Sequence, residues 1–189
     1  MHRWEIINTL IKRFGYQKYL EIGVAGGECF EKVEAEIKHG VDPDMSSAAT
    51  IHMTSNEWFA TLRPGYLYDI VFIDGLHLAK QVTIDILNSV ERLKPGGMIV
   101  LHDCNPPTYE HQIAEVPPDN RAWNGNVWKA FIASEYKREC VDTDWGVGII
   151  NPMEKGTPHS NISWEEFDER RKTLLNLITP NEFMTRYGE

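Results

Sequence analysis

Continuous apolar segments alternate with amphipathic segments through the first two thirds of this 189-residue chain, and this alternation constrains the fold more than any other feature. Uninterrupted apolar runs are typical of strands that are buried on both faces, as in parallel sheets covered by helices on both sides. Buried strands are expected at 18–24, 69–74 and 98–101, and weaker ones at 40–42 and 50–53. The sequence therefore predicts an α/β fold.

The segments between these strands have apolar residues at helical spacing. Helices are expected at 1–16, 27–37, 78–93, 127–135 and 163–178. Ser163 and Glu166 form a capping box that begins the C-terminal helical segment, 163–189. Two further short strands are expected at 137–142 and 146–150. With no repeat or linker in view, we interpret residues 1–189 as one domain.

One long stretch, 105–126, has no clear period and contains Pro106, Pro107, Pro117 and Pro118. Long loops in compact domains are often binding loops or lids. We therefore predict an active-site loop here.

The chain has a net charge of -9, which argues against nucleic acid or an anionic membrane surface as its main partner. It contains no apolar run near the roughly 20 residues that span a bilayer. Its three cysteines are an odd number and widely spaced, which is typical of reduced thiols. These features predict a cytoplasmic protein without a membrane span.

The first expected strand runs into a glycine-rich turn, Gly23-Val24-Ala25-Gly26-Gly27. Such a turn lets a ligand approach the backbone and the free amides of the following helix. The dinucleotide pattern G-x-G-x-x-G fails at Ala25 and Glu28, which disfavours a nicotinamide-dependent oxidoreductase. Glu21 suits a positively charged ligand group, and Asp42 can accept hydrogen bonds from both hydroxyls of a ribose.

These features resemble the class I S-adenosylmethionine-dependent methyltransferases, whose first motif is matched by Glu21-x-Gly23-x-x-x-Gly27, with Ala25 at the usual middle glycine. Segments 68–75 and 93–97 match the fourth and fifth strand regions of that class. The resemblance implies a Rossmann-like, seven-stranded, mostly parallel sheet with the last strand antiparallel and helices on both faces. It also implies S-adenosylmethionine as cofactor, with contacts at Glu21, Gly23, Val24, Ala25, Gly27, Asp42, Thr54, Ser55, Asn56 and Asp74.

Segments 123–129 and 143–148 resemble a subgroup common among sugar and polysaccharide O-methyltransferases, methyltransferase family 24. The resemblance implies methylation of a hydroxyl on a sugar or glycan, for example a terminal deoxysugar. Two alternatives stay open: an O-methyltransferase for a catechol-like or other small molecule, and a catalytically inactive module that binds S-adenosylmethionine. The partner is then a small-molecule or glycan acceptor. The sequence is also compatible with one domain of a larger glycan-modifying polypeptide, and it leaves the oligomeric state open.

Asp74 and Asp103 each follow a buried strand, so adjacent parallel strands would bring the two carboxylates together. Neighbouring carboxylates repel unless a proton or a cation lies between them. The pattern is similar to metal-dependent O-methyltransferases that act on catechols and macrolide sugars. It implies Asp74, Asp103 and Asn105 as ligands of Mg²⁺ or another divalent cation. The catalytic residues are then His77 as the base, and Asp74 and Asp103, which position the metal or the acceptor directly. Because Cys104 is a poor Mg²⁺ ligand, a site without metal is the alternative.

Three further residues are interpreted as substrate contacts: His102, Tyr109 and Trp123. Aromatic side chains offer faces on which a sugar can stack. Because neighbouring side chains alternate in a strand, His102 would point away from Asp103 and pack beneath the sheet, which is the alternative for that residue.

Overall fold

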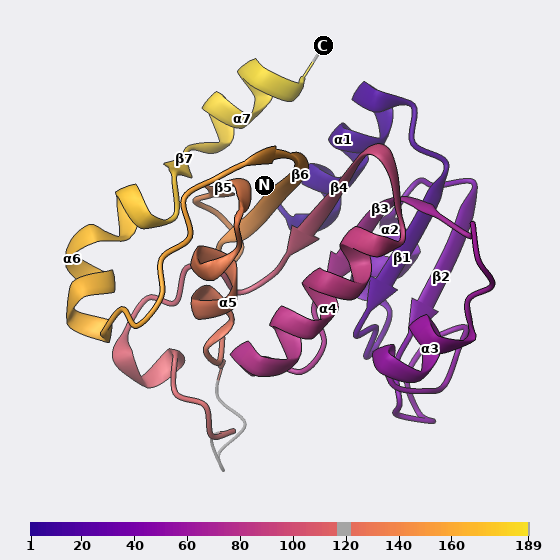
Figure 1. Cartoon of the computed structure of the whole chain (residues 1–189), viewed down its shortest axis with the longest axis horizontal. Helices are drawn as coiled ribbons and strands as arrows, with labels where there is room; N and C mark the ends of the chain where they lie inside the picture. The colour runs from indigo at the N-terminus through magenta and orange to yellow at the C-terminus, as the bar shows by residue number, and fades with distance from the viewer. Residues whose placement is uncertain (117–121, 189) are drawn as a thin grey trace.

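The computed structural model of the chain describes residues 1–116 and 122–188, and a seven-stranded sheet lies at its centre (Figure 1). The spatial order of the strands is β2-β1-β3-β4-β6-β5-β7. The strands are β1 (Lys18–Ile22), β2 (Ile37–Val41), β3 (Tyr68–Ile73), β4 (Leu93–Leu101), β5 (Tyr136–Val141), β6 (Val147–Lys155) and β7 (Leu177–Ile178). β6 runs antiparallel to both of its neighbours, and every other pairing among the described strands is parallel. The predicted mostly parallel sheet is confirmed.

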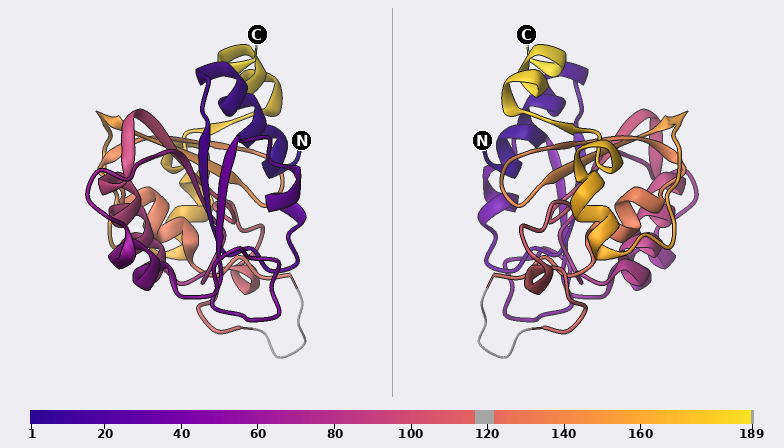
Figure 2. Two further views of the ribbon diagram at one scale, coloured as in Figure 1. Left: turned by 90° about the vertical axis from the view of Figure 1, so that its right-hand side faces the viewer. Right: turned by 90° about the vertical axis from the view of Figure 1, so that its left-hand side faces the viewer.

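Helices cover both faces of this sheet, and Figure 2 shows α7 beside α1 at one end of the molecule. The helices are α1 (Arg3–Phe14), α2 (Glu28–Lys32), α3 (Ser55–Thr61), α4 (Ala79–Glu91), α5 (Val127–Ala133), α6 (Trp164–Leu174), α7 (Pro180–Tyr187) and the short 3-10 helix η1 (Tyr109–His111). Within residues 1–116 and 122–188, no helix is both long and apolar enough to cross a membrane.

Two apolar clusters fill the space on either side of the sheet. One contains Leu20, Val71 and Ile99 from the strands and packs against α4, α5 and α6. The other contains the alternate strand residues, such as Tyr19 and Phe72, and packs against α1, α2 and α7. Because successive strand residues face opposite sides, strands buried on both faces must be apolar throughout.

Three expectations about local structure are wrong. The helix predicted at 27–37 ends at Lys32, because pairing with β1 draws Ile37–Val41 into the sheet and overrides local helix preference. The strand predicted at 50–53 is reduced to one bridge, between Val41 and Ile51. The C-terminal segment is divided into α6 and α7, because Leu177–Ile178 pairs with the edge of β5.

We predict that Phe167→Ala lowers the free energy of unfolding by about 3 to 5 kcal/mol, because large cavities in a packed core are costly. Phe167 is fully buried and stacks on Trp128, with 4.1 Å between the ring centroids. Urea denaturation measures the loss. Leu87→Ala on the exposed side of α4 is the control, with an expected change within about 0.5 kcal/mol. Equal effects of the two substitutions would contradict the assigned packing.

Candidate functional site

The turn after β1 depends on Gly23, which has a φ of 85°. A Cβ atom at this position would lie 2.2 Å from the carbonyl oxygen of Asp74 and 2.4 Å from the Cα of Gly75. Only glycine accepts both this backbone angle and this contact. Its absence of a side chain brings the carboxyl ends of β1 and β3 together, which is where ligands bind in parallel sheets.

Asp42, at the end of β2, fixes the shape of the same turn. One of its carboxylate oxygens accepts hydrogen bonds from the amides of Val24 and Ala25, each at 3.0 Å. Ala25 replaces the usual glycine yet keeps a left-handed backbone, with a φ of 44°. Gly27, with a φ of 84°, precedes the first residue of α2. The turn therefore keeps its glycine-like shape without the middle glycine.

A cavity of about 620 Å³ opens beside this turn. Among the predicted cofactor contacts, Gly23, Ala25, Asp42, Thr54, Ser55 and Asp74 line it. Val24 and Gly27 belong to the turn itself, and the Asn56 side chain accepts a hydrogen bond from Gln81. Asp74 and His77 also line the cavity, so the predicted catalytic residues and the glycine-rich turn border the same space.

Asp85 lines the same cavity and was missed in the sequence analysis. It lies on the buried side of α4, where it accepts hydrogen bonds from Ser55 Oγ at 2.6 Å and Gln81 Nε2 at 3.0 Å. Burial raises the pKa of its carboxyl group. The sequence did indicate that Asp85 is buried, because it lies between Val82 and Ile86, which form the apolar side of this helix.

Glu21 lies beneath the turn, with 1% of its surface exposed. The hydroxyl of Tyr19 donates a hydrogen bond to its carboxylate. Burial raises the pKa of Glu21 to about 8, although this hydrogen bond acts in the opposite direction. Glu21 is therefore paired with Tyr19 and, unlike Gly23 and Asp42, does not line the cavity.

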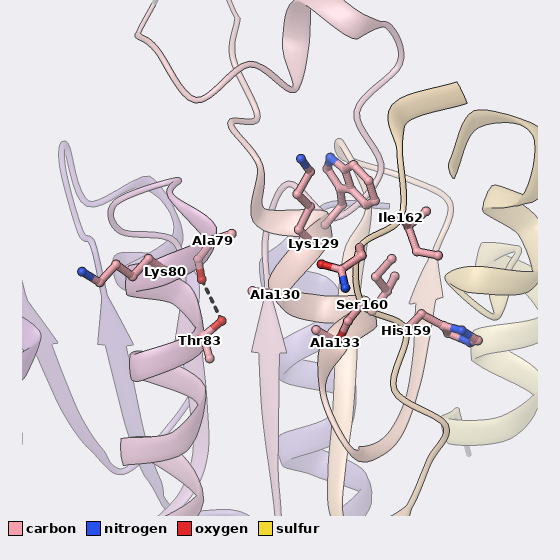
Figure 3. A pocket seen from close by; sticks show the side chains of 12 residues that line it. Ala79, Lys80, Thr83, Lys129, Ala130, Ala133, His159, Ser160 and Ile162 are labelled. Carbon is pink, nitrogen blue, oxygen red and sulfur yellow. Dashed lines mark hydrogen bonds between the residues drawn. The ribbon is translucent and has the colours of Figure 1, made fainter. Parts of the chain in front are cut away.

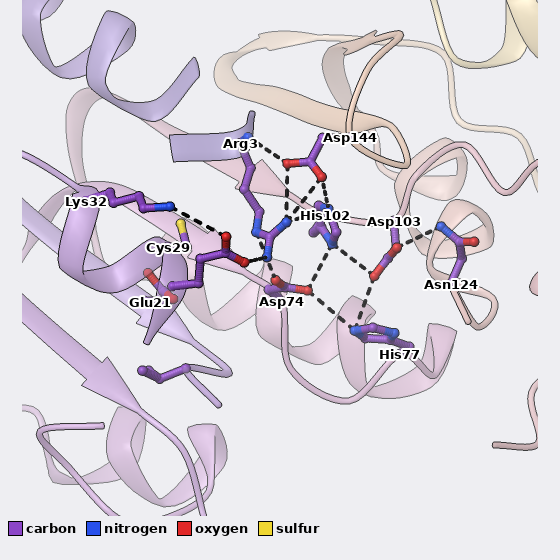
Figure 4. Close-up of polar contacts among 12 residues, drawn as sticks. Arg3, Glu21, Cys29, Lys32, Asp74, His77, His102, Asp103, Asn124 and Asp144 are labelled. Carbon is purple, nitrogen blue, oxygen red and sulfur yellow. Dashed lines mark hydrogen bonds and ion pairs between the residues drawn. The ribbon is translucent and has the colours of Figure 1, made fainter. Parts of the chain in front are cut away.

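The predicted catalytic residues do meet, at the carboxyl ends of β3 and β4 (Figure 4). Nε2 of His77 lies 3.4 Å from Asp74 Oδ1 and 3.3 Å from Asp103 Oδ2. Burial lowers the pKa of His77, but the two carboxylates raise it by more than burial lowers it. The net shift of this pKa is therefore upward. Burial raises the pKa of Asp74, while the two imidazoles lower it to below its usual range.

His102 joins this cluster instead of packing beneath the sheet. Its Nδ1 lies 3.1 Å from Asp103 Oδ2 and 3.3 Å from Asp74 Oδ1. The physical reason is the left-handed backbone of Asp103, with a φ of 61°, which interrupts strand alternation and turns both side chains to one side. Burial lowers the pKa of His102, but the surrounding carboxylates raise it to about 12.

Arg3 and Asp144 complete the charged cluster and were also missed. Arg3, in the first turn of α1, places its Nε 3.6 Å from Asp74 Oδ2 and its Nη1 3.2 Å from Asp144 Oδ1. The Asp144 carboxylate also accepts a hydrogen bond from the Arg3 amide at 2.8 Å. No sequence signal places the start of the chain at this edge of the sheet. Asp144 did lie in a segment, 143–148, that the resemblance singled out.

The segment 123–126 holds His77 from the opposite side. The Trp123 ring stacks on His77 at 5.2 Å, and its carbonyl oxygen lies 3.2 Å from His77 Nδ1. A side chain at Gly125 would collide with the His77 backbone. Asn124 is fully buried and donates a hydrogen bond to Asp103 at 2.7 Å. The described ends of the 105–126 loop thus contribute to the site, while residues 117–121 lie outside the described residues.

Two predicted residues do not join the cluster. Tyr109 is exposed and contacts the edge of Trp164. Asn105 donates to Asp142 at 3.0 Å and accepts from Arg171 at 2.6 Å. Cys104 is buried below the site, with its Sγ directed at backbone carbonyls.

Of the predicted Mg²⁺ ligands, Asp74 and Asp103 lie together, whereas the Asn105 side chain is bonded to Asp142 and Arg171. Asp74, His102 and Asp103 form a group that could hold a cation, with ligating atoms within 4.8 Å of one another. Two carboxylate oxygens and one imidazole nitrogen suit divalent ions that accept nitrogen ligands.

A second pocket of about 350 Å³ lies between α4, α5 and residues 159–162 (Figure 3). Lys80 and His159 point away from each other on opposite sides of this pocket. These two side chains therefore do not converge on a common point, unlike Asp74 and His77 at the first cavity.

Residues 29–104 match a family model described as a methyltransferase domain. No curated protein matches the sequence. Among solved structures, the chain resembles an O-methyltransferase from Bacillus cereus in complex with SAH, with a TM-score of 0.56, 13% identity and coverage of 78% of this chain and 80% of that one. Cofactor-bound Rv0187 from MTB has a TM-score of 0.57 and 14% identity, with 82% of each chain covered.

The O-methyltransferase TomG from Streptomyces achromogenes, involved in tomaymycin synthesis and in complex with SAM, is also similar. Its TM-score is 0.51 at 16% identity, with 76% of this chain and 77% of that one covered. At these identities the solved structures establish the fold alone, which is that of the class I S-adenosylmethionine-dependent methyltransferases. The match of residues 29–104 to a methyltransferase domain supports a methyltransferase. The predicted fold class is confirmed.

We predict that Glu21 makes the protein less stable as pH rises from about 4.5 to 8. In this window the folded state keeps a proton on Glu21 that the unfolded chain has lost, because the pKa is raised from 4.5 to about 8. The contribution is at most about 1.4 kcal/mol per pH unit. Urea denaturation at pH 6 and 8 should show a smaller loss in Glu21→Gln than in the wild type. Identical losses would contradict a protonated Glu21.

Proposed function

We propose that this methyltransferase transfers the methyl group of S-adenosylmethionine to a hydroxyl oxygen of a sugar or glycan. The observation that carries this proposal is the position of His77. His77 lines the 620 Å³ cavity, and its Nε2 lies 3.4 Å from Asp74 Oδ1 and 3.3 Å from Asp103 Oδ2. A hydroxyl is a weak acid, so its methylation benefits from a base beside the methyl donor.

In the proposed binding mode, Asp42 accepts hydrogen bonds from the ribose, and Thr54 and Ser55 border the adenine. The methionine end of the cofactor extends past Gly23 toward Asp74. This binding mode is supported by the cavity, which Asp42, Ser55, Asp74 and His77 all line. Helix α4 and Asp85 close the side toward the adenine.

In the proposed reaction, the acceptor oxygen attacks the methyl carbon in line with the carbon–sulfur bond. That bond breaks, its electron pair stays on sulfur, and the sulfonium becomes the neutral thioether of S-adenosylhomocysteine. Nε2 of His77 takes the hydroxyl proton, while the carbonyl of Trp123 and the ring stacked on His77 hold the imidazole in place. A divalent ion at Asp74, His102 and Asp103 would supply positive charge that makes a nearby hydroxyl more acidic.

Two features support a sugar as the acceptor. Trp123 lies against His77 and is only partly buried, and Trp145 is exposed near the ring of His111. The aromatic face of Trp123 beside the base suits a sugar ring. The Bacillus and Streptomyces neighbours are O-methyltransferases by name, which favours oxygen as the methylated atom. A catechol-like acceptor is the alternative to a sugar, and the same assay tests it.

The three buried free thiols fit a cytoplasmic location.

We predict micromolar binding of S-adenosylhomocysteine in calorimetric titration, and a loss of about tenfold or more in Asp42→Asn. The substitution weakens both the ribose contacts and the hydrogen bonds to Val24 and Ala25. Asp44→Asn is the matched control, since Asp44 bonds to Ser46 two residues away and does not line the cavity. Failure of the wild type to bind would overturn the cofactor assignment.

We predict that His77→Ala lowers turnover by about 10² to 10⁴ fold, the usual contribution of a general base. The affinity for S-adenosylhomocysteine should stay within about threefold of the wild type, because the Gly23 turn and Asp42 are untouched. Methyl transfer to terminal deoxysugars and to catechols, followed by mass spectrometry, measures turnover. Wild-type turnover in this variant would remove His77 from the mechanism.

A further inference from the structure

Trp145 has a backbone conformation that is unusual for a residue of its size. Its φ is 64°, within a run of three left-handed residues that also includes Asp144 at 46° and Gly146 at 86°. A left-handed backbone is an outlier for a bulky side chain, and such strain persists only where the surrounding structure enforces it. Because strained residues concentrate at functional sites, this turn indicates a function for the Trp145 side chain.

The turn 144–146 is held from two sides. The carbonyl oxygen of Trp145 accepts a hydrogen bond from the Asn105 amide at 2.9 Å. A Cβ atom at Gly146 would lie 2.4 Å from the same amide nitrogen, so the two segments are in direct contact. On the other side, the Asp144 carboxylate accepts a hydrogen bond from the Arg3 amide at 2.8 Å. The strained backbone is therefore fixed by α1 and by the segment that follows β4.

This backbone turns the Trp145 side chain toward solvent instead of burying it. The residue is 41% exposed, and its ring is tilted against the ring of His111, with 5.6 Å between the centroids. A tryptophan that is turned outward gives up the burial that normally stabilises so large a side chain. The fold therefore bears both backbone strain and exposed apolar area to keep this ring accessible.

Trp145 and His111 border the charged cluster. Asp144, which precedes Trp145, places its Oδ1 3.5 Å from His102 Nε2. The carbonyl oxygen of His111 accepts a hydrogen bond from the amide of Asn124 at 2.9 Å. Neither Trp145 nor His111 lines the cofactor cavity. Their place beside the cluster and outside that cavity suits contact with the acceptor.

The strand order separates Trp145 from the proposed base. His77 follows β3, Trp145 precedes β6, and β4 lies between these two strands. Two strand spacings amount to about 9.5 Å. A sugar ring beside His77 is narrower than this separation, so the unit that would reach Trp145 is its neighbour along a glycan.

We propose that Trp145, with His111 beside it, binds a second sugar unit of the acceptor, next to the unit that is methylated. The aromatic face of Trp145 stacks against the apolar face of that second ring. The acceptor is then the end of a glycan, rather than a free monosaccharide or a catechol. This inference rests on the proposed function, because it names the acceptor of that reaction.

The test compares methyl transfer to two methyl glycosides, one of L-rhamnose alone and one of a disaccharide that ends in L-rhamnose, by mass spectrometry. We expect the wild-type kcat/KM to be roughly tenfold higher for the disaccharide, through a lower KM, which is the scale of one tryptophan contact. Trp145→Ala should bring this ratio of kcat/KM values to about one, and Trp145→Phe, which retains an aromatic face, should keep most of it. Phe14→Ala is the matched control, since Phe14 is 44% exposed at the end of α1, and it should leave the ratio unchanged.

Urea denaturation tests the strain from which the role of Trp145 is inferred. Trp145→Gly should unfold at a higher urea concentration than Trp145→Ala, because glycine adopts a φ of 64° without strain and alanine does not. Equal midpoints of the two variants would contradict that strain.

Equal wild-type kcat/KM for the two glycosides, or an unchanged ratio in Trp145→Ala, would overturn the second sugar subsite and leave the proposed methyl transfer standing. Binding of the disaccharide is measured on the same samples by saturation-transfer NMR. If neither glycoside is methylated, binding of the disaccharide that is lost in Trp145→Ala would support the subsite and count against the proposed function. Absence of both methylation and binding would overturn the subsite.

Discussion

The contact between Gly23 and the backbone of Asp74 and Gly75 determines how the rest of the site is arranged. No side chain fits between these segments, since a Cβ atom would lie 2.2 Å from the Asp74 carbonyl oxygen. The contact fixes the ends of β1 and β3 relative to each other. Consequently the cavity beside the glycine-rich turn and the cluster of acids and histidines share Asp74, which belongs to both.

The cluster concentrates charge in a place where charge is costly. Asp103 and His102 are almost fully buried, and Asp74 is mostly so. Buried charges are tolerated only when they are paired and hydrogen-bonded. Arg3 supplies one permanent cation from the first turn of α1, and the fold anchors that turn to Asp144 through both its backbone and its side chain. The N-terminal helix is thus part of the electrostatic balance of the site as well as a cover for the sheet.

Much of the fold could be predicted from the sequence, because strands buried on both faces and helices with one apolar side leave distinct patterns. Because Asp74 and Asp103 each follow a buried strand, the sequence also predicted that these residues and His77 lie at adjacent strand ends. Where local pattern and sheet pairing disagreed, pairing determined the outcome: the stretch after Lys32 looked helical, yet β2 begins at Ile37. The register between paired strands depends on contacts between residues that are distant in sequence, so a short stretch of sequence cannot specify it.

The position of His102 could not be predicted from the alternation of side chains along a strand. Strand alternation sends adjacent side chains to opposite faces, and it predicted that His102 would be separated from Asp103. One left-handed residue, Asp103 at a φ of 61°, reverses that result and brings an imidazole into the acidic cluster. Asparagine and aspartate adopt this conformation more readily than other residues with side chains, so the sequence permitted it without specifying it. The position of the His102 imidazole inside the acidic cluster therefore depends on one backbone angle.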